Sequence, residues 1–94
     1  MALKFEWDDV KASANLRKHQ VSFEEGKTVF NDPFLMTFPD PDHSDGEQRY
    51  LNIGRSAKER ILVVIHTERE ASVRIISCRK ETASERRGYE QENS

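Results

Sequence analysis

The chain of 94 residues is long enough for one domain with a modest core and too short for two. Hydrophobic residues make up 35% and charged residues 34%, and five Phe, two Tyr and one Trp supply large apolar side chains, so the composition excludes a disordered polypeptide. The net charge of −2 argues against a general polyanion binder, although residues 1–48 hold 5 Lys and Arg against 10 Asp and Glu, whereas residues 49–94 hold 10 against 7.

The first elements expected are a short strand over residues 5–7 and a helix over residues 8–18. Apolar and polar residues alternate in the strand, and the aspartates that follow it are suitable helix caps. Helical spacing places Ala12 and Leu16 on the buried side of the helix. A polar stripe with spacings of three and four, interpreted as a solvated face, occupies the other side: Asp8, Lys11, Asn15 and Lys18.

A second helix is expected from a cap at Ser22 to about Phe30. Ser22 and Glu25 match a capping box, in which the hydroxyl accepts from the amide of residue 25 and the carboxylate reaches back. The Asn-Asp-Pro sequence at residues 31–33 ends this helix, because proline disfavours helical backbone in the residue before it. The core face is expected to consist of Phe23, Gly26, Val29 and Phe30.

The second half predicts strands. Hydrophobic residues change to a period of two at residues 35–38, which predicts a strand, and a polar, turn-rich loop at residues 40–48 follows. Three further strands joined by short turns form an antiparallel meander, at residues 49–56, 60–67 and 72–79. Residues 61–65 are apolar on both faces, so their strand is expected to be central.

Thr82 and Glu85 match a second capping box and open a last helix, which is expected to end near Glu90 or Gln91. The predicted fold class is therefore α+β. A four-stranded antiparallel sheet with a short N-terminal strand packs with two N-terminal helices and one C-terminal helix, in one domain over residues 1–94.

No segment is predicted to enter a membrane. The N-terminal residues MALKFEWDDV lack the apolar stretch of a signal peptide, and the longest aliphatic run, residues 61–65, is too short to span a bilayer. We therefore expect a cytoplasmic protein without a membrane partner. The single cysteine, Cys78, lies in an apolar run, so an internal disulfide is excluded and a catalytic thiol is not favoured.

Metal and cofactor sites are not expected. His19, His43 and His66 are widely separated, and the compact nucleotide-binding and zinc-protease motifs are missing from the sequence. The acidic loop lacks the spacing of an EF-hand, so a solvated turn is favoured over a divalent-cation site at Asp40, Asp42, His43, Asp45 and Glu47.

The basic residues between Arg74 and Tyr89 are the candidates for chemistry. Alternation along the strand predicts Arg74 on one face and Arg79 on the other, and Arg86, early in the last helix, can fold back toward the strand's end. Arginine binds phosphate oxygens bidentately and stays charged at neutral pH. Tyr89 lies on the same helical face as Arg86, where it can stack on a base or transfer a proton. Further cations predicted to bind RNA are Lys80, Arg87 and Lys18.

His66, at the end of the apolar strand, is the histidine nearest the basic half and the candidate base or acid. Metal-free RNA cleavage needs a base for the 2′-hydroxyl, cations for the phosphoryl oxygens and an acid for the departing 5′-oxygen. Structural alternatives remain open, because a strand-end histidine can bond the backbone and arginines can pair with Glu81, Glu85 or Glu90. The predicted catalytic set is His66, Arg74, Arg79, Arg86 and Tyr89.

The sequence resembles the BrnT family of type II toxins over nearly its whole length. The resemblance is carried by FEWDDVKASANLRKHQVSFEEGKTVFNDP, PDPDHSDGEQRYLNIGRS, ILVVIHTER and RIISCRKETASERRGYE. It implies a RelE-like fold, a ribonuclease that arrests translation, and a ribbon-helix-helix antitoxin of the BrnA type whose complex with the toxin binds operator DNA mainly through the antitoxin. Three positions depart from the family: Gln20 replaces a common glycine, and Cys78 and Lys80 replace alanine and arginine.

A function of a different class stays open beside the ribonuclease. The protein is then a binding module that holds the antitoxin and takes part in repressing a promoter, with weak catalysis or none. The acidic N-terminal half offers a surface for a basic antitoxin segment. Growth arrest on expression separates the two functions, because a pure binding module is harmless without its partner.

Overall fold

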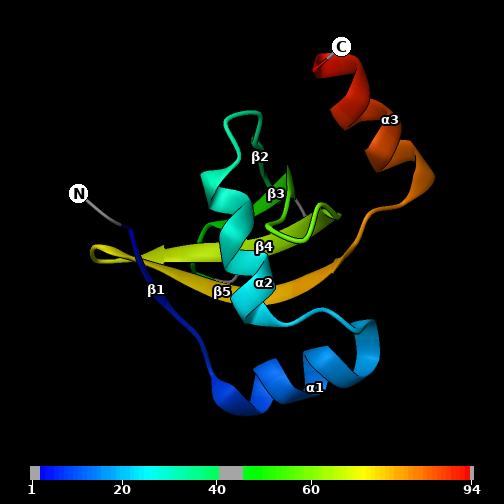
Figure 1. The fold of residues 1–94 in the computed structure, drawn as a ribbon. Coiled ribbons are helices and arrows are strands. Elements are labelled where there is room, and N and C mark those ends of the chain that lie inside the picture. Colours follow the sequence, from blue (N-terminus) through cyan, green and yellow to red (C-terminus); the bar gives the residue numbers. More distant parts are fainter. Residues whose placement is uncertain (1–2, 41–45, 94) are drawn as a thin grey trace.

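The computed structural model describes residues 3–40 and 46–93, so Asp42, His43 and Asp45 of the predicted acidic loop lie outside the described residues. The α+β fold class and the predicted order of elements are confirmed, with one added 3-10 helix (Figure 1). The elements are β1 (Lys4–Glu6), α1 (Asp9–His19), α2 (Phe23–Lys27), η1 (Thr28–Asn31), β2 (Met36–Pro39), β3 (Arg49–Arg55), β4 (Ile61–Arg69), β5 (Ser72–Lys80) and α3 (Ala83–Glu92).

One five-stranded sheet runs in the order β1-β5-β4-β3-β2. The predicted antiparallel meander of β2 to β5 is confirmed, and β4 is its central strand, as its continuous apolar run requires. The N-terminal strand β1, for which sequence alone named no partner, joins the outer edge of β5 in parallel, with Phe5 opposite Val73. Covering that edge leaves β5 with hydrogen-bonded neighbours on both sides.

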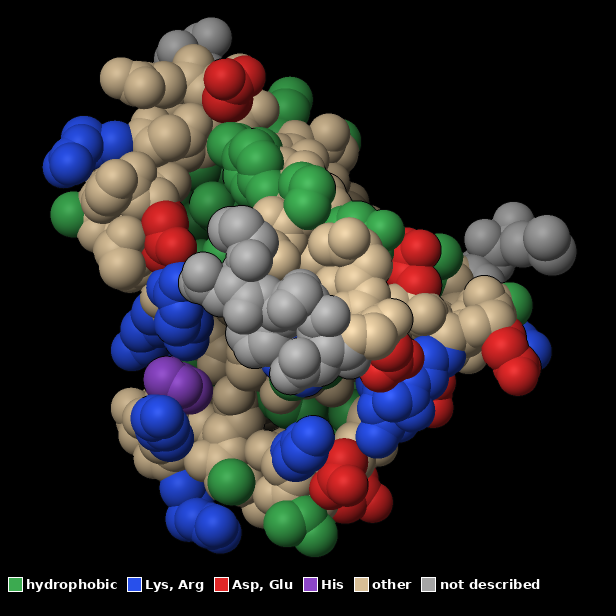
Figure 2. Space-filling model, turned by 180° about the vertical axis from the view of Figure 1, so that it is seen from behind, with side chains coloured by type: hydrophobic (Ala, Val, Ile, Leu, Met, Phe, Trp, Pro, Cys, Tyr) green, Lys and Arg blue, Asp and Glu red, His purple; other side chains and the backbone are tan. Residues whose placement is uncertain are grey.

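The two faces of the sheet carry different cores. α1 and α2 cover one face, where the buried side chains are Val21, Phe23, Val29, Leu62, Val64, Val73, Ile75 and Cys78. α3 covers part of the other face through Tyr89, which packs with Ile53, Ile61 and Val63. Figure 1 shows α1 and α3 at opposite ends of the molecule. Apolar side chains remain visible from behind on the face beside α3 (Figure 2).

The predicted faces of β5 are wrong because a β-bulge lies between Ile65 and His66 of the neighbouring strand β4. The bulge leaves Ile76 between two paired residues, so strict alternation is interrupted there. Arg79 pairs with Val63 and lies on the same face as Arg74, whereas the sequence pattern placed these two arginines on opposite faces. A pattern of period two cannot reveal an extra residue whose position depends on a partner strand.

α1 begins and ends at strong local signals. Asp8 caps the helix by accepting from the amides of Val10 and Lys11 at 2.8 and 3.1 Å. The helix ends at Gln20, whose φ of 57° lies in the left-handed region where glycine is favoured. A residue with a Cβ at this position costs about 1 kcal/mol relative to glycine.

The predicted exposed and buried sides of α1 are wrong at Asn15 and Leu16, respectively. Asn15 is buried and joins α1 to β5, because its amide nitrogen donates to the carbonyls of Val21 and Cys78 at 2.9 Å and its oxygen accepts from the Cys78 amide. Leu16, predicted to be buried, is 50% exposed. Asn15 therefore satisfies backbone groups at a sharp chain reversal, a role that spacing cannot indicate.

The first capping box is half formed. The Ser22 hydroxyl accepts from the amide of Glu25 at 3.0 Å, as predicted, but the Glu25 carboxylate does not return to the cap. It binds Arg60 and the Ser56 hydroxyl instead, because those groups of the turn after β3 compete for the same carboxylate. The helix continues beyond Lys27 only as the 3-10 helix η1.

Candidate functional site

Four cations line one cleft at the end of the sheet where β3 and β5 finish and β4 begins. We call this hollow the cationic cleft; its volume is about 260 Å³ and its lining residues are Arg55, Glu59, Arg60, Ile61, Lys80, Glu81 and Arg86. The cations come from three strand ends and from α3. Antiparallel pairing brings the strand ends together, and the capping box of Thr82 and Glu85 directs α3 away from the last of them.

Internal carboxylates hold two of these cations. Arg60 donates to Glu25, whose pKa is lowered, first by this hydrogen bond and also by the Ser56 hydroxyl, despite the opposing effect of burial. Arg86 lies 3.5 Å from Glu81 and 3.4 Å from Glu90. Lys80 is exposed and makes no ion pair within the described part of the chain. Carboxylates therefore hold two of the four cations, and Lys80 is not held in this way.

Arg55 is positioned by a partly buried cluster beneath α3. Asp32 accepts from the Arg55 amide at 2.8 Å and from the Tyr89 hydroxyl at 2.6 Å, and the Arg55 guanidinium lies 5.8 Å from the centre of the Tyr89 ring. Burial raises the pKa of Tyr89, and the Asp32 carboxylate raises it further. Tyr89 is 3% exposed, so its ring is a support for Arg55 and α3, and it is not open for base stacking in this conformation.

Arg79 lies beside the cleft and does not line it. Its guanidinium donates to both carboxylate oxygens of Glu85 at 2.8 Å, and Glu85 also accepts from the amide of Thr82, which completes the predicted capping box. The pKa of Glu85 falls to about 2, first because of the hydrogen bond from Arg79. Arg79 therefore fastens the first turn of α3 to the end of β5.

His66 is buried on the sheet face covered by α1 and α2, away from the cleft. Its ring stacks on Tyr50 and meets Phe30 edge-on, and its Nδ1 accepts from the amide of Asn52 at 2.7 Å. Burial lowers the pKa of His66, although the Glu68 carboxylate 3.6 Å from Nε2 opposes this. The ring is therefore neutral at pH 7, with its proton on Nε2.

The predicted catalytic set is thus divided between the two ends of β5. Arg74 pairs with Glu6 at 3.3 Å near the beginning of β5, at the same end of the sheet as His66. Arg86 and Lys80 line the cationic cleft, and Arg79 and Tyr89 adjoin it. The remaining predicted RNA-binding residues, Lys18 on α1 and Arg87 on α3, are exposed and do not line the cleft.

The sequence pattern does not indicate Arg55 and Arg60, two of the four cations of the cleft. They flank the turn between β3 and β4, which is the one signal that would have drawn attention to them, because strand ends often carry functional groups. For Asp32 the sequence pattern predicts only a place at the end of a helix. Its contacts with Arg55 and Tyr89 span 23 and 57 residues of sequence, beyond the reach of any local pattern.

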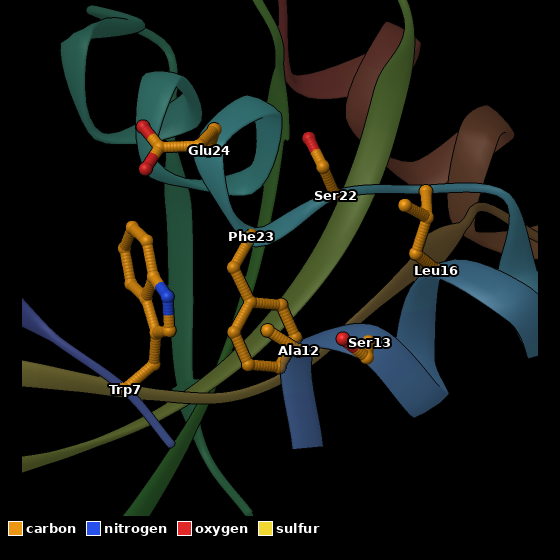
Figure 3. A pocket seen from close by; sticks show the side chains of 7 residues that line it. All are labelled: Trp7, Ala12, Ser13, Leu16, Ser22, Phe23 and Glu24. Atoms are coloured by element: carbon orange, nitrogen blue, oxygen red, sulfur yellow. The ribbon is translucent and has the colours of Figure 1, made fainter. Parts of the chain in front are cut away.

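An apolar hollow of about 180 Å³ between α1 and α2 offers a contrast. It is lined by Trp7, Ala12, Ser13, Leu16, Ser22, Phe23 and Glu24, with the Trp7 and Phe23 rings side by side (Figure 3). No cation lines it, so it is unsuited to phosphate. Cys78, in the core nearby, has a thiol whose pKa burial raises to about 12, which makes it a poor nucleophile.

Among the residues described, the structure contains no group of three side chains suited to hold a metal ion, and no helix long and apolar enough to cross a membrane. The fold is similar to that of the Brucella abortus ribonuclease toxin BrnT, known from a 1.1 Å crystal structure. The TM-score is 0.67 at 23% sequence identity, covering 86% of this chain and 99% of the other. This likeness shows the shared fold.

No curated protein matches the sequence. Residues 7–85 match the family described as "Ribonuclease toxin, BrnT, of type II toxin-antitoxin system", a span that begins directly after β1 and includes all the other strands and the beginning of α3. The resemblance that the sequence motifs indicated is thereby confirmed. The chain belongs to the BrnT family of ribonuclease toxins of type II toxin–antitoxin systems.

Proposed function

We propose that this protein is an endoribonuclease that cleaves RNA in the cationic cleft without a metal ion and thereby arrests translation in the cytoplasm. The observation that carries the proposal is the convergence of Arg55, Arg60, Lys80 and Arg86 on one hollow, with the carboxylates of Glu59 and Glu81 in its wall. Such a set matches a phosphodiester, whose charge grows on the phosphoryl oxygens in the transition state. Family membership supplies the ribonuclease class.

The proposed reaction forms one bond at phosphorus and breaks another. Glu81, whose side chain is 18% exposed, takes the proton of the 2′-hydroxyl, and the 2′-oxygen attacks the adjacent phosphorus. Arg86 and Arg60 stabilise the phosphoryl oxygens, and Lys80 gives a proton to the departing 5′-oxygen. The products are a 2′,3′-cyclic phosphate and a 5′-hydroxyl, and exchange with water restores both side chains.

The other predicted residues have supporting roles in this proposal. Arg79 and Tyr89 position α3 and Arg55 through Glu85 and Asp32. His66 and Arg74 lie outside the cleft. His66 stabilises the opposite end of the sheet by stacking on Tyr50, and Arg74 pairs with Glu6 and contributes to the overall electrostatic field of the protein.

The test uses purified protein and messenger RNA in EDTA, with fragment ends identified by mass spectrometry. We expect cyclic-phosphate ends, and a fall in rate of about 100-fold in Arg86→Ala and in Glu81→Gln. Arg17→Ala, an exposed arginine on α1, is the matched control and should cleave at the rate of the unmodified protein. RNA that stays intact at a large excess of protein would refute the proposal.

A catalytically weak binding module is the second candidate. The internal pairing of Arg60 with Glu25 and of Arg79 with Glu85 favours it, because paired cations also serve to hold the fold together. Apolar positions left partly exposed beside α3, Met36, Leu51 and Ile65, favour it as well. Expression without an antitoxin distinguishes the candidates: growth arrest that Arg86→Ala abolishes supports the ribonuclease, and normal growth supports the binding module.

We also propose a partner of the BrnA type, a ribbon-helix-helix antitoxin, through which the complex binds operator DNA. Membership of a type II toxin family implies a protein antitoxin and supports this proposal. Co-expression with the antitoxin is expected to restore growth. In a gel-shift assay, operator DNA should be retarded by the complex and by the antitoxin, and toxin alone should leave it free. Retardation by toxin alone would contradict this assignment.

A further inference from the structure

A second hollow adjoins the cationic cleft and shares Arg55 with it. We call it the side cleft; its volume is about 280 Å³ and it is lined by Thr28, Asn31, Asp32, Pro33, Arg55, Ser56 and Ala57. The turn between β3 and β4 contributes to both hollows, with its first residues in the side cleft and its last in the cationic cleft. A strand of RNA with a phosphate in the cationic cleft therefore has an adjacent place for a neighbouring group.

The polar groups of the side cleft are almost all engaged within the protein. The Thr28 hydroxyl donates to the Glu25 carbonyl and accepts from the Ala57 amide. The Ser56 hydroxyl donates to the Glu25 carboxylate and accepts from Lys58 and Arg60 amides.

Asp32 is also engaged, because its two oxygens accept from the amides of Phe34 and Arg55 and from the Tyr89 hydroxyl. Asn31 differs: it is exposed at the end of η1, and within the described residues its side-chain amide makes no hydrogen bond. One donor–acceptor group of this hollow is therefore free for a ligand.

We infer that the side cleft binds the nucleobase next to the phosphate held in the cationic cleft, and that Asn31 distinguishes one base from another. This inference rests on the proposed function. An amide can donate and accept at a base edge, which makes asparagine a base-reading side chain. Arg55 provides the stacking surface, because its guanidinium is held over the Tyr89 ring while the side chain remains exposed.

The size of the side cleft suits a single base. Pockets for whole drug-sized ligands measure about 300–1,000 Å³, and the side cleft, at about 280 Å³, lies near the lower limit of that range. Pro33 and Ala57 give it apolar walls, which suit a flat ring more than a phosphate. Charge and apolar surface are thus divided between the two hollows, as the phosphate and the base of a nucleotide require.

The experiment measures binding apart from cleavage. Four tetranucleotides, each of a single base and protected by 2′-O-methyl groups, are titrated into the unmodified protein and into Asn31→Ala, and the dissociation constants are compared. We expect the unmodified protein to distinguish the best from the worst base by about tenfold, and Asn31→Ala to lose most of this ratio. Gln48→Ala, the control, removes an exposed amide at the other end of β3 and should leave the ratio between the best and the worst base unchanged.

Two further variants separate base reading from general binding. Arg86→Ala should weaken all four oligonucleotides in parallel, since a phosphate contact carries no base information. Asn31→Asp, which replaces the amide donor by an acceptor, should shift the preference toward bases that present an amino group, such as cytosine.

The outcomes separate the inference from the proposed function. Equal binding of all bases by the unmodified protein, or a preference that survives in Asn31→Ala, overturns the inference even if RNA is cleaved. A preference that depends on Asn31 supports the inference even if the protein cleaves nothing, and in that case the proposed ribonuclease mechanism is the part that fails.

Discussion

The two ends of β5 carry similar residues in very different surroundings. Near its beginning, Arg74 pairs with Glu6 of β1, and His66 of the neighbouring strand is buried between Tyr50 and Phe30. At its other end, Arg79 and Lys80 lie where β3 finishes, β4 begins and α3 starts. The first end is closed by a parallel edge strand, whereas the second opens into the cationic cleft.

This difference shows that a candidate binding site depends more on the convergence of several chain segments than on the presence of charged residues. One cation with one carboxylate stabilises a local contact, as Arg74 and Glu6 do. Four cations from separate segments converge on one hollow, and Lys80 among them makes no ion pair within the described residues, so a cationic group remains for a ligand. The following predictions test this contrast between the two ends, beginning with the largest effect.

Removal of one cation from each end should affect cleavage very differently. Arg86→Ala is expected to lower kcat/KM by about 100-fold, because a group that stabilises the phosphoryl oxygens is lost. Arg74→Ala should cost about threefold, through the long-range field alone. Rates are measured on a defined RNA, with Arg17→Ala as control. An Arg74 variant as impaired as the Arg86 variant would contradict the assignment of the site to the cleft.

The ion pairs at the two ends should differ in their effect on stability. Arg79→Ala breaks a bidentate pair and leaves Glu85, whose side chain is 20% exposed, without its partner, so we expect a loss on the order of 2 kcal/mol in the free energy of unfolding. Arg74→Ala breaks a longer contact, whose carboxylate partner Glu6 has a side chain that is 42% exposed, and should cost less than about 1 kcal/mol. Urea titration followed by circular dichroism measures both, and equal losses would remove this distinction.

Two tyrosines provide a matched comparison of hydroxyl groups. Tyr89→Phe keeps the ring and removes the hydrogen bond to Asp32. It should lower stability by about 1 kcal/mol and also slow cleavage, because Asp32, which holds the Arg55 amide, loses one of its partners. Tyr50→Phe at the other end retains the ring stacked on His66, and the Tyr50 hydroxyl makes no hydrogen bond among the described residues, so little change is expected. Thermal unfolding and cleavage rates of both variants test this, and identical behaviour would count against a supporting role for Tyr89.

The two ends should also titrate in different pH windows, with the smallest effect from the histidine. Glu85 has a pKa of about 2 in the folded protein and 4.5 as reference, so its stabilisation is present above pH 4.5 and is lost as the pH falls toward 2.

Burial lowers the pKa of His66 below its reference of 6.5, and the unfolded chain therefore takes up a proton first as the pH falls below 6.5. Stability contributed by the neutral ring is complete above that pH and declines below it. The free energy of unfolding is measured with urea from pH 8 to pH 3. The decline in stability below pH 6.5 should disappear in His66→Gln, and the decline below pH 4.5 should disappear in Glu85→Gln. A profile unchanged in both variants would show that other groups control the pH dependence.

Much of the fold was predictable because its signals are local. The capping box of Thr82 and Glu85, the alternation of the strands and the apolar run of β4 each involve residues a few positions apart. The candidate site was predictable only in part: Lys80 and Arg86 were identified from basic composition, while Arg55 and Arg60 at a turn had no comparable signal.

By itself, the sequence determined the order of elements, the central position of β4 and the basic character of the second half, since propensity, periodicity and charge act over short distances along the chain. Tertiary structure decided which groups meet. The bulge that places Arg79 and Arg74 on one face depends on the pairing of two strands. Glu25 binds Arg60 across 35 residues of sequence, and Asp32 binds Tyr89 across 57, because folding brings distant carboxylates and donors into hydrogen-bonding distance and no local spacing encodes that proximity.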